Sequence, residues 1–319
     1  MSLDRLCIAI ASRRSTASVV DEVSLDIWPG EIVGLIGESG SGKTIISLAT
    51  LGLLPPAARI ASGEIRLSGE TISGRSEREL KRIRGNRIAM VPQDALRALN
   101  PVQRVGRQVG EPFAIHRGWS ARRSQRAAVE LLRSVHLPVP EARATEYPHQ
   151  FSGGMQQRAM IAMGLALEPE LVVADEPTTA LDVTVQARVL QLLREIRDTH
   201  GTAILFVTHD LGIVSQLCDW VYVIYAGRIM EEGPRRELFA HPRHPYTQLL
   251  LRATPTLRSA REDLLGIPGQ IPSPFALPVG CRFADRCPQR IDRCATLPPS
   301  LTVGPDHSAS CWLAEPPNG

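Results

Sequence analysis

A glycine-rich loop near the N-terminus constrains the fold of this chain more than any other segment. Residues 37–44 read Gly-Glu-Ser-Gly-Ser-Gly-Lys-Thr, which matches the phosphate-binding pattern G-x-x-x-x-G-K-[ST]. An apolar run from Glu31 to Ile36 precedes the loop, and a helical pattern follows it. Such a loop points successive backbone N–H groups at one anion, and the next helix N-terminus adds its dipole. The sequence therefore predicts a strand–loop–helix unit that binds a nucleoside triphosphate.

Two side chains of this loop suit the triphosphate and its cation. Lys43 is one of only two lysines among 36 basic residues, and its compact charge suits the β- and γ-phosphates better than a planar guanidinium. The Thr44 hydroxyl suits Mg²⁺. We expect the nucleotide to contact the loop at Gly37, Ser39, Gly40, Ser41, Gly42, Lys43 and Thr44.

Composition excludes several classes of protein. The chain has 319 residues, 43% hydrophobic and 22% charged, so it can form one large domain or two modest ones and is neither collagen-like nor disordered. The net charge of +3 is small. Aromatic residues make up only 4% of the chain and are not interleaved with basic ones, so we expect no nucleic-acid partner. The uncharged apolar stretch at residues 44–58 is too short to cross a bilayer. With no secretory signal pattern, we expect a cytosolic protein or one at a cytosolic membrane face.

Apolar strand patterns alternate with helical ones along the chain, which indicates a parallel sheet covered by helices on both faces. Residues 1–35 alternate apolar and polar side chains, as short strands do. We expect helices within 99–164 and 183–198, and strands at 171–174 and 203–207. After about Pro234 the periodicity weakens and proline and histidine increase, so we expect a C-terminal extension there.

Two carboxylates follow the apolar run at residues 171–174. Asp175 and Glu176 would lie at the carboxyl edge of a parallel sheet, where ligands of such folds bind. Asp175 can hold Mg²⁺ through water, and Glu176 can accept a hydrogen bond from an attacking water; the alternative is a solvated turn or a helix cap. His209 follows the next strand and could reach a γ-phosphate from the same edge.

A second anion site is indicated at Phe151-Ser152-Gly153-Gly154-Met155-Gln156-Gln157-Arg158, where Ser-Gly-Gly opens a helix. This segment resembles the signature motif of ABC-type ATPases. The other motifs follow in the order of that family: the phosphate loop, Gln93 in Val-Pro-Gln-Asp, the signature, the Asp175-Glu176 strand, Thr-Ala-Leu-Asp ending at Asp182, and His209. The resemblance covers about residues 3–240.

The resemblance implies a P-loop NTPase of the α/β, RecA-like class, with a parallel sheet and an inserted helical subdomain at about 96–164. Residues 1–240 would be the nucleotide-binding domain, and 241–319 a small cysteine-containing extension. In this family two ATPase domains face each other head to tail, so that the phosphate loop of one and the signature of the other close on the same ATP.

The resemblance also implies a role for each motif residue. Lys43, Glu176 and His209 would be catalytic, with Glu176 polarising the lytic water and His209 holding the γ-phosphate. Asp182 would bridge the two halves of the dimer. Thr44, Gln93 and Asp175 would serve Mg²⁺, and Gln93 would also report nucleotide state to membrane helices. Ser152, Gly153 and Gly154 would bind the nucleotide of the partner.

One position departs from the family pattern. ABC ATPases usually stack an aromatic side chain near the N-terminus on adenine, but here that position falls near Ile10. No Phe, Tyr or Trp occurs before Trp28. An aliphatic surface would replace the stacked ring, or the stacking is lost.

The extension narrows the family. Residues 241–247, His-Pro-Arg-His-Pro-Tyr-Thr, and the later segment Gly280-Cys281-Arg282-Phe283 resemble oligopeptide and dipeptide importers, to which the nickel importers are close. His241 and His244 are expected to form a rigid turn rather than a metal site, because the adjacent prolines are a poor scaffold for ligands.

Four cysteines cluster in the extension: Cys281, Cys287, Cys294 and Cys311. Their spacing lacks the C-x₂-C pairs of structural zinc and differs from the ferredoxin patterns, so spacing alone leaves metal and reduced thiols open. Some dipeptide-importer ATPases carry a [4Fe–4S] cluster on cysteines arranged in a similar way, and this resemblance implies one here, with zinc as the alternative. Cys7 and Cys218 are expected to be small core residues.

Together these resemblances imply an ATP-hydrolysing subunit of a peptide importer, with ATP and Mg²⁺, peripheral on the cytoplasmic face of the inner membrane. Its partners would be a second ABC ATPase subunit (identical or homologous), two membrane permease subunits and an extracytoplasmic solute-binding protein. The alternatives are a nickel or other small-solute importer, or a soluble ABC ATPase of DNA repair or translation. The transported solute is not encoded in this chain.

Overall fold

The structure is a computed structural model that describes residues 1–12, 15–179, 181–253 and 266–314. The chain forms two compact units. The first comprises 1–27, 32–73 and the described part of 207–319, and the second comprises 28–31 and the described part of 74–206.

The first unit contains a four-stranded antiparallel sheet of order β2-β1-β4-β5. Its strands are β1 (Ser2–Ala11), β2 (Thr16–Asp26), β4 (Ala58–Leu67) and β5 (Glu70–Thr71). The buried side chains do not keep a strict period of two, because bulges shift the register near Arg5 and Glu22, which both have positive φ. Gly63 lies opposite the first bulge, where an added Cβ would approach the carbonyl oxygen of Arg5 to 2.3 Å. The short strands expected here are therefore longer than predicted and irregular.

A second set of strands in this unit runs in the order β11-β12-β10-β9-β3. The parallel pair is β3 (Ile32–Ile36) with β9 (Trp220–Tyr225), and antiparallel pairing adds β10 (Arg228–Pro234), β12 (His307–Ala309) and β11 (Leu301–Gly304). Ala226 and Gly227 join β9 to β10 with φ of 46° and 83°, as a two-residue hairpin with right-handed strand twist requires. The antiparallel strands add to the parallel pairing that the sequence predicts.

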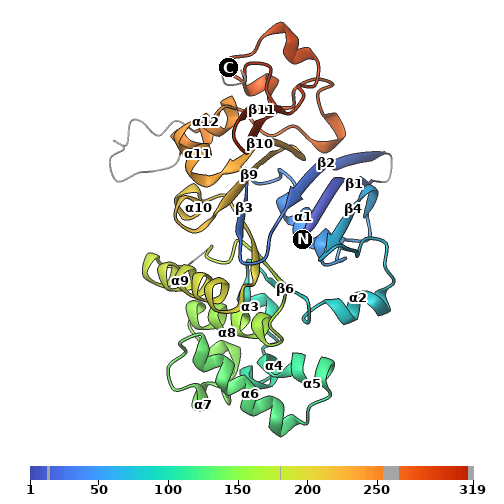
Figure 1. Ribbon diagram of the computed structural model, residues 1–319. Coiled ribbons are helices and arrows are strands. Elements are labelled where there is room, and N and C mark those ends of the chain that lie inside the picture. The colour runs from blue at the N-terminus through green and yellow to red at the C-terminus, as the bar shows by residue number, and fades with distance from the viewer. Residues whose placement is uncertain (13–14, 180, 254–265, 315–319) are drawn as a thin grey trace. The chain divides into compact units, whose positions relative to one another are not determined.

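The helices of the first unit are α1 (Lys43–Thr50), α10 (Leu211–Leu217), α11 (Arg235–Ala240) and α12 (Pro245–Arg252), with the 3₁₀ turns η3 (Pro274–Ala276), η4 (Ala284–Arg286) and η5 (Asp292–Ala295). Figure 1 shows α11 and α12 together beside β10. The cysteine-bearing region after residue 266 is mostly irregular and contains these three 3₁₀ turns.

The second unit combines three strands with most of the helices. Strands β6 (Ile88–Val91) and β7 (Leu171–Asp175) pair in parallel, and β8 (Ala203–Thr208) lies on the other side of β7 and leads the chain back to the first unit. The parallel sheet that the sequence predicts is present in this pair, although the strand at β6 was not predicted from the sequence. All five residues of β7 are buried, as expected for a strand covered on both faces.

Most helices of the second unit lie within or close to the ranges 99–164 and 183–198 that the sequence predicts, but the two that begin at Glu77 and Ala95 were not predicted. The helices of this unit are α2 (Glu77–Ile83), α3 (Ala95–Ala98), α4 (Val105–Val109), α5 (Glu111–Arg117), α6 (Ala121–Ser134), α7 (Pro140–Arg143), the 3₁₀ turn η1 (Pro148–Gln150), α8 (Gly153–Leu165) and α9 (Val183–His200). Figure 1 shows α4, α6 and α8 packed side by side. Residues such as Ala128, Leu132 and Ala162 are fully buried within this group.

Candidate functional site: a phosphate loop and a carboxylate edge

The phosphate loop lies in the first unit between β3 and α1. Gly40 and Gly42 have φ of 84° and 108°, a left-handed conformation that disfavours any residue with a Cβ. A Cβ at Gly37 would lie 2.2 Å from the carbonyl oxygen of Ile224. The glycines are therefore required by the curl of the backbone, whatever the loop binds.

The polar groups of this loop fit an anion with a cation beside it. The Lys43 ammonium is buried and donates to the carbonyl oxygens of Gly37 and Glu38 at 2.6 and 3.0 Å. The Ser41 hydroxyl is buried and has no hydrogen-bond partner among the described residues, which is the expected state of a group that meets a ligand. Thr44 and Gly40 are exposed, and the space around a Cβ at Gly40 is open.

His209 also belongs to the first unit. It follows β8 directly and is exposed. The next residue, Asp210, caps α10 by accepting a hydrogen bond of 3.2 Å from the backbone N–H of Ile213, and its own N–H donates to the Thr208 hydroxyl. This local network fixes the backbone on which His209 is carried.

The second unit brings the predicted residues Gln93 and Glu176 together at the end of β7. Asp175 is buried as the last residue of the strand, and Glu176 follows with φ of +48°, a strained conformation for a residue other than glycine. The Glu176 carboxylate accepts hydrogen bonds from the amide of Gln93 and the hydroxyl of Thr179, both at 3.0 Å. Sequence reasoning did not assign Thr179 this role.

The signature segment opens α8 as predicted. Ser152 caps the helix, with its hydroxyl accepting from the N–H of Met155 at 3.4 Å. Gly153 is exposed in the first turn, whereas Gly154 is buried against Val185 of α9, where a Cβ would lie 2.3 Å from a methyl carbon. Asp182 caps α9 through the N–H of Val185 at 3.0 Å; Ala180 of this motif lies outside the described residues.

Comparison with known proteins identifies two matching protein families. Residues 20–179 match the ABC transporter family, and residues 230–294 match the oligopeptide/dipeptide transporter C-terminal region. The chain belongs to the ABC transporter family. Its fold is the α/β P-loop class that the sequence predicts.

Relatives of this ABC protein match it over nearly its whole length. It is 46% identical over 93% of its length, and 90% of the relative's, to a probable peptide ABC transporter ATP-binding protein of Sinorhizobium fredii. It is also similar to the dipeptide transport ATP-binding proteins DppD of Bacillus subtilis, at 41% identity over 99% and 95% of the two chains, and of Escherichia coli, at 40% over 97% and 95%.

Among solved structures, the ABC protein is similar to the ATP-binding cassette MJ0796, described as dimeric in a post-hydrolysis state bound to ADP and Pi. The TM-score is 0.66 at 28% identity, covering 74% of this chain and 98% of that one. The soluble repair or translation class considered from the sequence receives no support from these comparisons. None of the helices in the described residues has the length and apolar character needed to cross a membrane.

The four extension cysteines of the ABC protein interact with one another. The thiols of Cys294, Cys311 and Cys287 all act on the pKa of Cys281, which burial, the largest cause, raises to about 11. Burial also raises the pKa values of Cys287 and Cys311. Within the described residues, however, no group of three or more His, Cys, Asp or Glu side chains is arranged to hold a metal ion. The expected iron–sulfur ligand set is thus not supported in this geometry.

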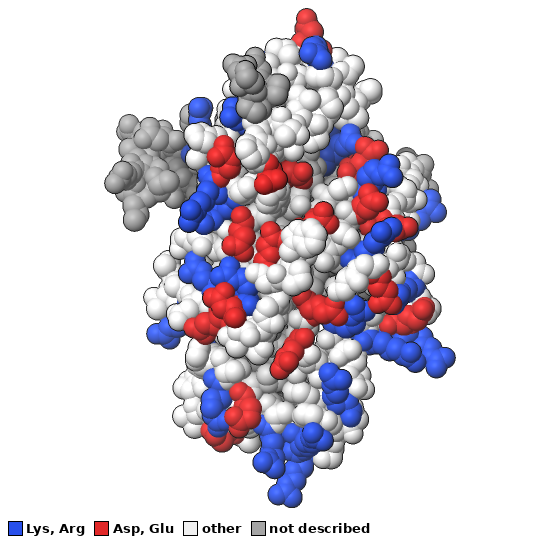
Figure 2. All heavy atoms as spheres, in the orientation of Figure 1, with Lys and Arg blue, Asp and Glu red and all other residues white. Residues whose placement is uncertain are grey.

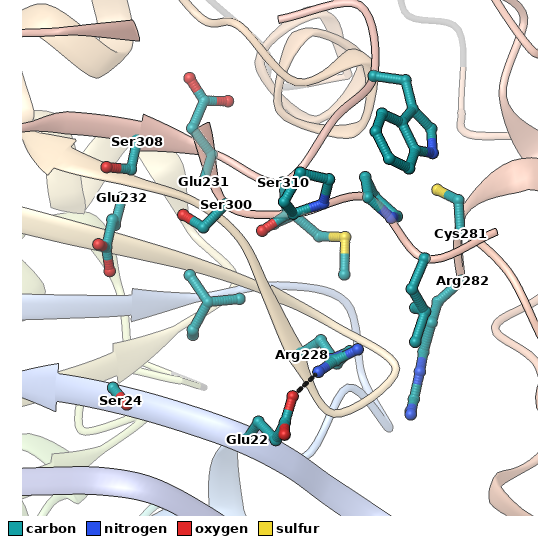
Figure 3. Close-up of a pocket in the computed structure, with 16 residues that line it drawn as sticks. Glu22, Ser24, Arg228, Glu231, Glu232, Cys281, Arg282, Ser300, Ser308 and Ser310 are labelled. Carbon is teal, nitrogen blue, oxygen red and sulfur yellow. Dashed lines mark hydrogen bonds and ion pairs between the residues drawn. The ribbon is translucent and has the colours of Figure 1, made fainter. Parts of the chain in front are cut away.

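A pocket of about 670 Å³ lies beside the cysteine segment. Figure 3 shows Cys281 and Arg282 on one side of it and the ion pair between Glu22 and Arg228 on another. Its lining contains none of the phosphate-loop residues, so it is distinct from the nucleotide site. Of the remaining cysteines, Cys218 is buried as expected, whereas Cys7 is only partly buried and accepts a hydrogen bond from the N–H of Glu22.

The histidines of residues 241–247 form a turn, as predicted. His244 caps α12, with Nδ1 accepting from the N–H of Tyr246 at 3.0 Å, and it is 1% exposed. The carboxylate of Glu231, which is fully buried, accepts from the N–H of His244 at 2.9 Å. Burial lowers the pKa of His244 to about 4, so the ring is neutral and its Nδ1 can accept the hydrogen bond from the N–H of Tyr246.

Acidic and basic side chains are interspersed over the face seen in Figure 2, and basic ones gather at the end where Figure 1 shows α5 and α6. There the Arg123 guanidinium lies 3.7 Å from the ring centroid of Trp119, which stacks on Phe113 with centroids 4.7 Å apart. Trp119 lies just before α6 and Arg123 in its first turn, so this contact joins one arginine to one aromatic pair.

Proposed function

We propose that this chain hydrolyses ATP as a subunit of an importer that takes up peptides through separate membrane subunits. The observation that carries the proposal is the pairing of a phosphate loop between β3 and α1 with an oligopeptide/dipeptide transporter C-terminal region in the same chain. The names of the relatives support peptides as the solute class. A nickel or other small-solute importer stays the alternative.

The proposed division of labour follows the motifs. The N–H groups of residues 37–44 and the Lys43 ammonium hold the phosphates, and Thr44 and Gln93 bind Mg²⁺, with Asp175 acting on the ion through water. Mg²⁺ neutralises charge on the phosphates when bound. Glu176 orients the attacking water, and the hydrogen bonds from Gln93 and Thr179 place its carboxylate. His209 contacts the γ-phosphate.

Hydrolysis in this proposal needs a second ATPase subunit. Ser152, Gly153 and Gly154 present the start of α8 to the nucleotide held by the partner, and Asp182 lies at the contact between subunits. Positioning and charge neutralisation dominate phosphoryl transfer, so dividing the donors between two chains makes hydrolysis depend on closure. The similar solved structure, the ATP-binding cassette MJ0796, is described as dimeric, which is consistent with this arrangement.

The proposed domains are a nucleotide-binding domain at 1–240, with a helical subdomain at about 96–164, and an extension at 241–319. We place the chain peripherally on the cytoplasmic face of the inner membrane, with two permease subunits and an extracytoplasmic solute-binding protein as partners.

For the extension we propose a [4Fe–4S] cluster on Cys281, Cys287, Cys294 and Cys311. The proposal depends on the resemblance of the cysteine arrangement to that of dipeptide-importer ATPases, since the described residues contain no group of side chains arranged to hold a metal ion. The test is anaerobic purification of the full chain, with iron and acid-labile sulfide measured beside zinc. Equal amounts of iron and sulfide, lost together in Cys281→Ser, support the cluster, and stoichiometric zinc without iron contradicts it.

The transport function is tested in vesicles that contain the chain with the permease, ATPase and solute-binding proteins of its gene neighbourhood. We expect uptake of a labelled dipeptide that requires MgATP and is lost in Lys43→Ala. ATP-dependent uptake of Ni²⁺ without dipeptide uptake would favour the alternative, and MgATP hydrolysis that never couples to either solute would contradict an importer.

A further inference from the structure

Glu38, the second residue of the phosphate loop, forms an ion pair with Arg286 of the C-terminal extension. The guanidinium of Arg286 forms two parallel hydrogen bonds with the Glu38 carboxylate, from Nη1 at 2.6 Å and from Nη2 at 3.0 Å. The Arg286 side chain is only 7% exposed and that of Glu38 27%. A bidentate, charge-assisted pair that is largely shielded from water is directional and strong.

The backbone of Glu38 is held as well. Its N–H donates to the hydroxyl of Tyr246 at 2.9 Å, and its carbonyl oxygen accepts from the Lys43 ammonium at 3.0 Å. The N–H, the carbonyl and the carboxylate are therefore all engaged, and two of these three anchors come from the extension. The loop that meets the phosphates is thus fixed in part by residues more than 200 positions away in sequence.

The two anchoring side chains are themselves held rigidly. Arg286 ends the 3₁₀ turn η4, directly before Cys287, and also donates from Nε to the carbonyl of Pro268 at 2.7 Å and from Nη2 to that of Ile267 at 3.1 Å. Phe283, which directly precedes this turn, packs edge-on against Tyr225 and at a tilt against Tyr246, with each pair of centroids 5.2 Å apart. Arginine and aromatic side chains thus form one buried support under the loop.

Tyr246 is placed by the turn at residues 241–247. Its backbone N–H is capped by His244, and Tyr246 is fully buried. The hydroxyl stays protonated, because burial raises its pKa. The proline- and histidine-rich motif therefore places the Tyr246 hydroxyl where it accepts the hydrogen bond from the N–H of Glu38.

We propose that Arg286 and Tyr246 are positioning residues that keep the phosphate loop in its binding conformation, so that the cysteine-bearing extension sets the affinity of the site for MgATP. The inference rests on the proposed function only in that the loop binds ATP. Preorganised loops bind more tightly because less freedom is lost on binding. Any rearrangement near Cys287 reaches the loop through the adjacent Arg286.

The test compares Arg286→Gln, Glu38→Gln and the double variant in the full chain, by titration with a fluorescent ATP analogue in the presence of Mg²⁺ and by ATPase kinetics in the assembled transporter. We expect each single change to raise Kd and KM about tenfold, the effect of losing a charge-assisted hydrogen bond, with kcat altered less than about twofold. The double variant should be no worse than either single one. Arg290→Gln, which breaks an exposed ion pair with Asp285 in the same segment, is the matched control and should bind like wild type.

Unchanged Kd in folded Arg286→Gln, or effects that simply add in the double variant, would overturn the proposal. If Arg286→Gln does not fold, Glu38→Gln and Tyr246→Phe carry the test, and unchanged affinity in both would refute it. Failure of the proposed function is separable, because wild-type chain that binds MgATP but drives no transport contradicts the importer while leaving the binding comparison intact.

Discussion

The side-chain amide of Gln93 donates a hydrogen bond of 3.0 Å to the carboxylate of Glu176. The two residues are 83 positions apart, and they follow neighbouring parallel strands, β6 and β7. The carboxylate that would orient water is thus tied to the residue expected to report nucleotide state. Movement of Gln93 would release or turn Glu176.

Replacement of Glu176 by Gln should stop turnover without preventing nucleotide binding. The carboxamide cannot take up a proton from water, and general-base contributions are typically about 10²–10⁴-fold. We expect kcat to fall at least about 10²-fold, while MgATP shifts the variant to a dimer in size-exclusion chromatography. Glu64→Gln, at an exposed carboxylate paired with Arg66, serves as control. Turnover close to wild type in Glu176→Gln would exclude the assigned role.

Gly154→Ala should destabilise the protein through contact with one side chain. The new Cβ would lie 2.3 Å from a methyl carbon of Val185, and overpacking of this kind costs about 1–3 kcal/mol. Because the clash is with a side chain, the second change Val185→Ala should restore most of the loss. Chemical denaturation of the single and double variants measures this, and a double variant less stable than Gly154→Ala would show that the contact is not the cause.

Two glycines with similar φ provide a matched comparison. Gly227, in the hairpin between β9 and β10, and Gly69 have φ of 83° and 81°, but only at Gly227 would a Cβ approach another group, the Val19 carbonyl oxygen at 2.5 Å. Gly69→Ala should cost about 1 kcal/mol from backbone strain alone, and Gly227→Ala clearly more. Equal losses of stability in the two variants, measured by thermal unfolding, would mean that the backbone near Val19 moves away from the new Cβ at no cost.

Stability should fall in mild acid because of His244. The folded pKa is lowered to about 4 by burial, whereas the unfolded ring titrates near its ordinary value, so the unfolded state takes up a proton first as pH falls. This linkage should remove about 1.5 kcal/mol of stability between pH 6.5 and 5.

The variant His244→Asn keeps a capping oxygen for α12 but cannot titrate, so its stability curve should be flatter over this range than that of the wild type. His241→Asn changes an exposed imidazole in the same turn and serves as control. Parallel curves for wild type and His244→Asn, measured by denaturation at each pH, would rule out His244 as the source. Glu231 and His307, which lie in the same buried network, are retained in every variant.

Much of the fold could be predicted because its signals are local. The phosphate loop, the strand before Asp175 and the Ser-Gly-Gly helix start each depend on a few consecutive residues, and the structure forms a strand, a loop or a helix at each. The antiparallel strands were missed because the turn at Ala226-Gly227 was not recognised as a hairpin. Bulges at Arg5 and Glu22 carry no glycine to mark them.

The contacts that hold the site were harder to predict, because they join distant segments. Arg286 and Glu38 are 248 positions apart, and Tyr246 and Glu38 are 208 apart. A single sequence contains no periodicity or spacing that pairs them. Only the folded chain shows that the motif at residues 241–247 and the segment after Cys281 converge on one residue of the phosphate loop.

The buried carboxylate of Glu231 has a practical consequence for anyone who shortens this protein. One of its oxygens accepts from His307, a residue of the final strand, at 2.8 Å, while the other accepts from the start of α12. Trimming the chain ahead of position 307 would leave the fully buried carboxyl group of Glu231 with one fewer hydrogen-bond partner, next to the turn that supplies Tyr246. Because Tyr246 accepts the hydrogen bond from the N–H of Glu38, we expect removal of the C-terminal strand to weaken nucleotide binding.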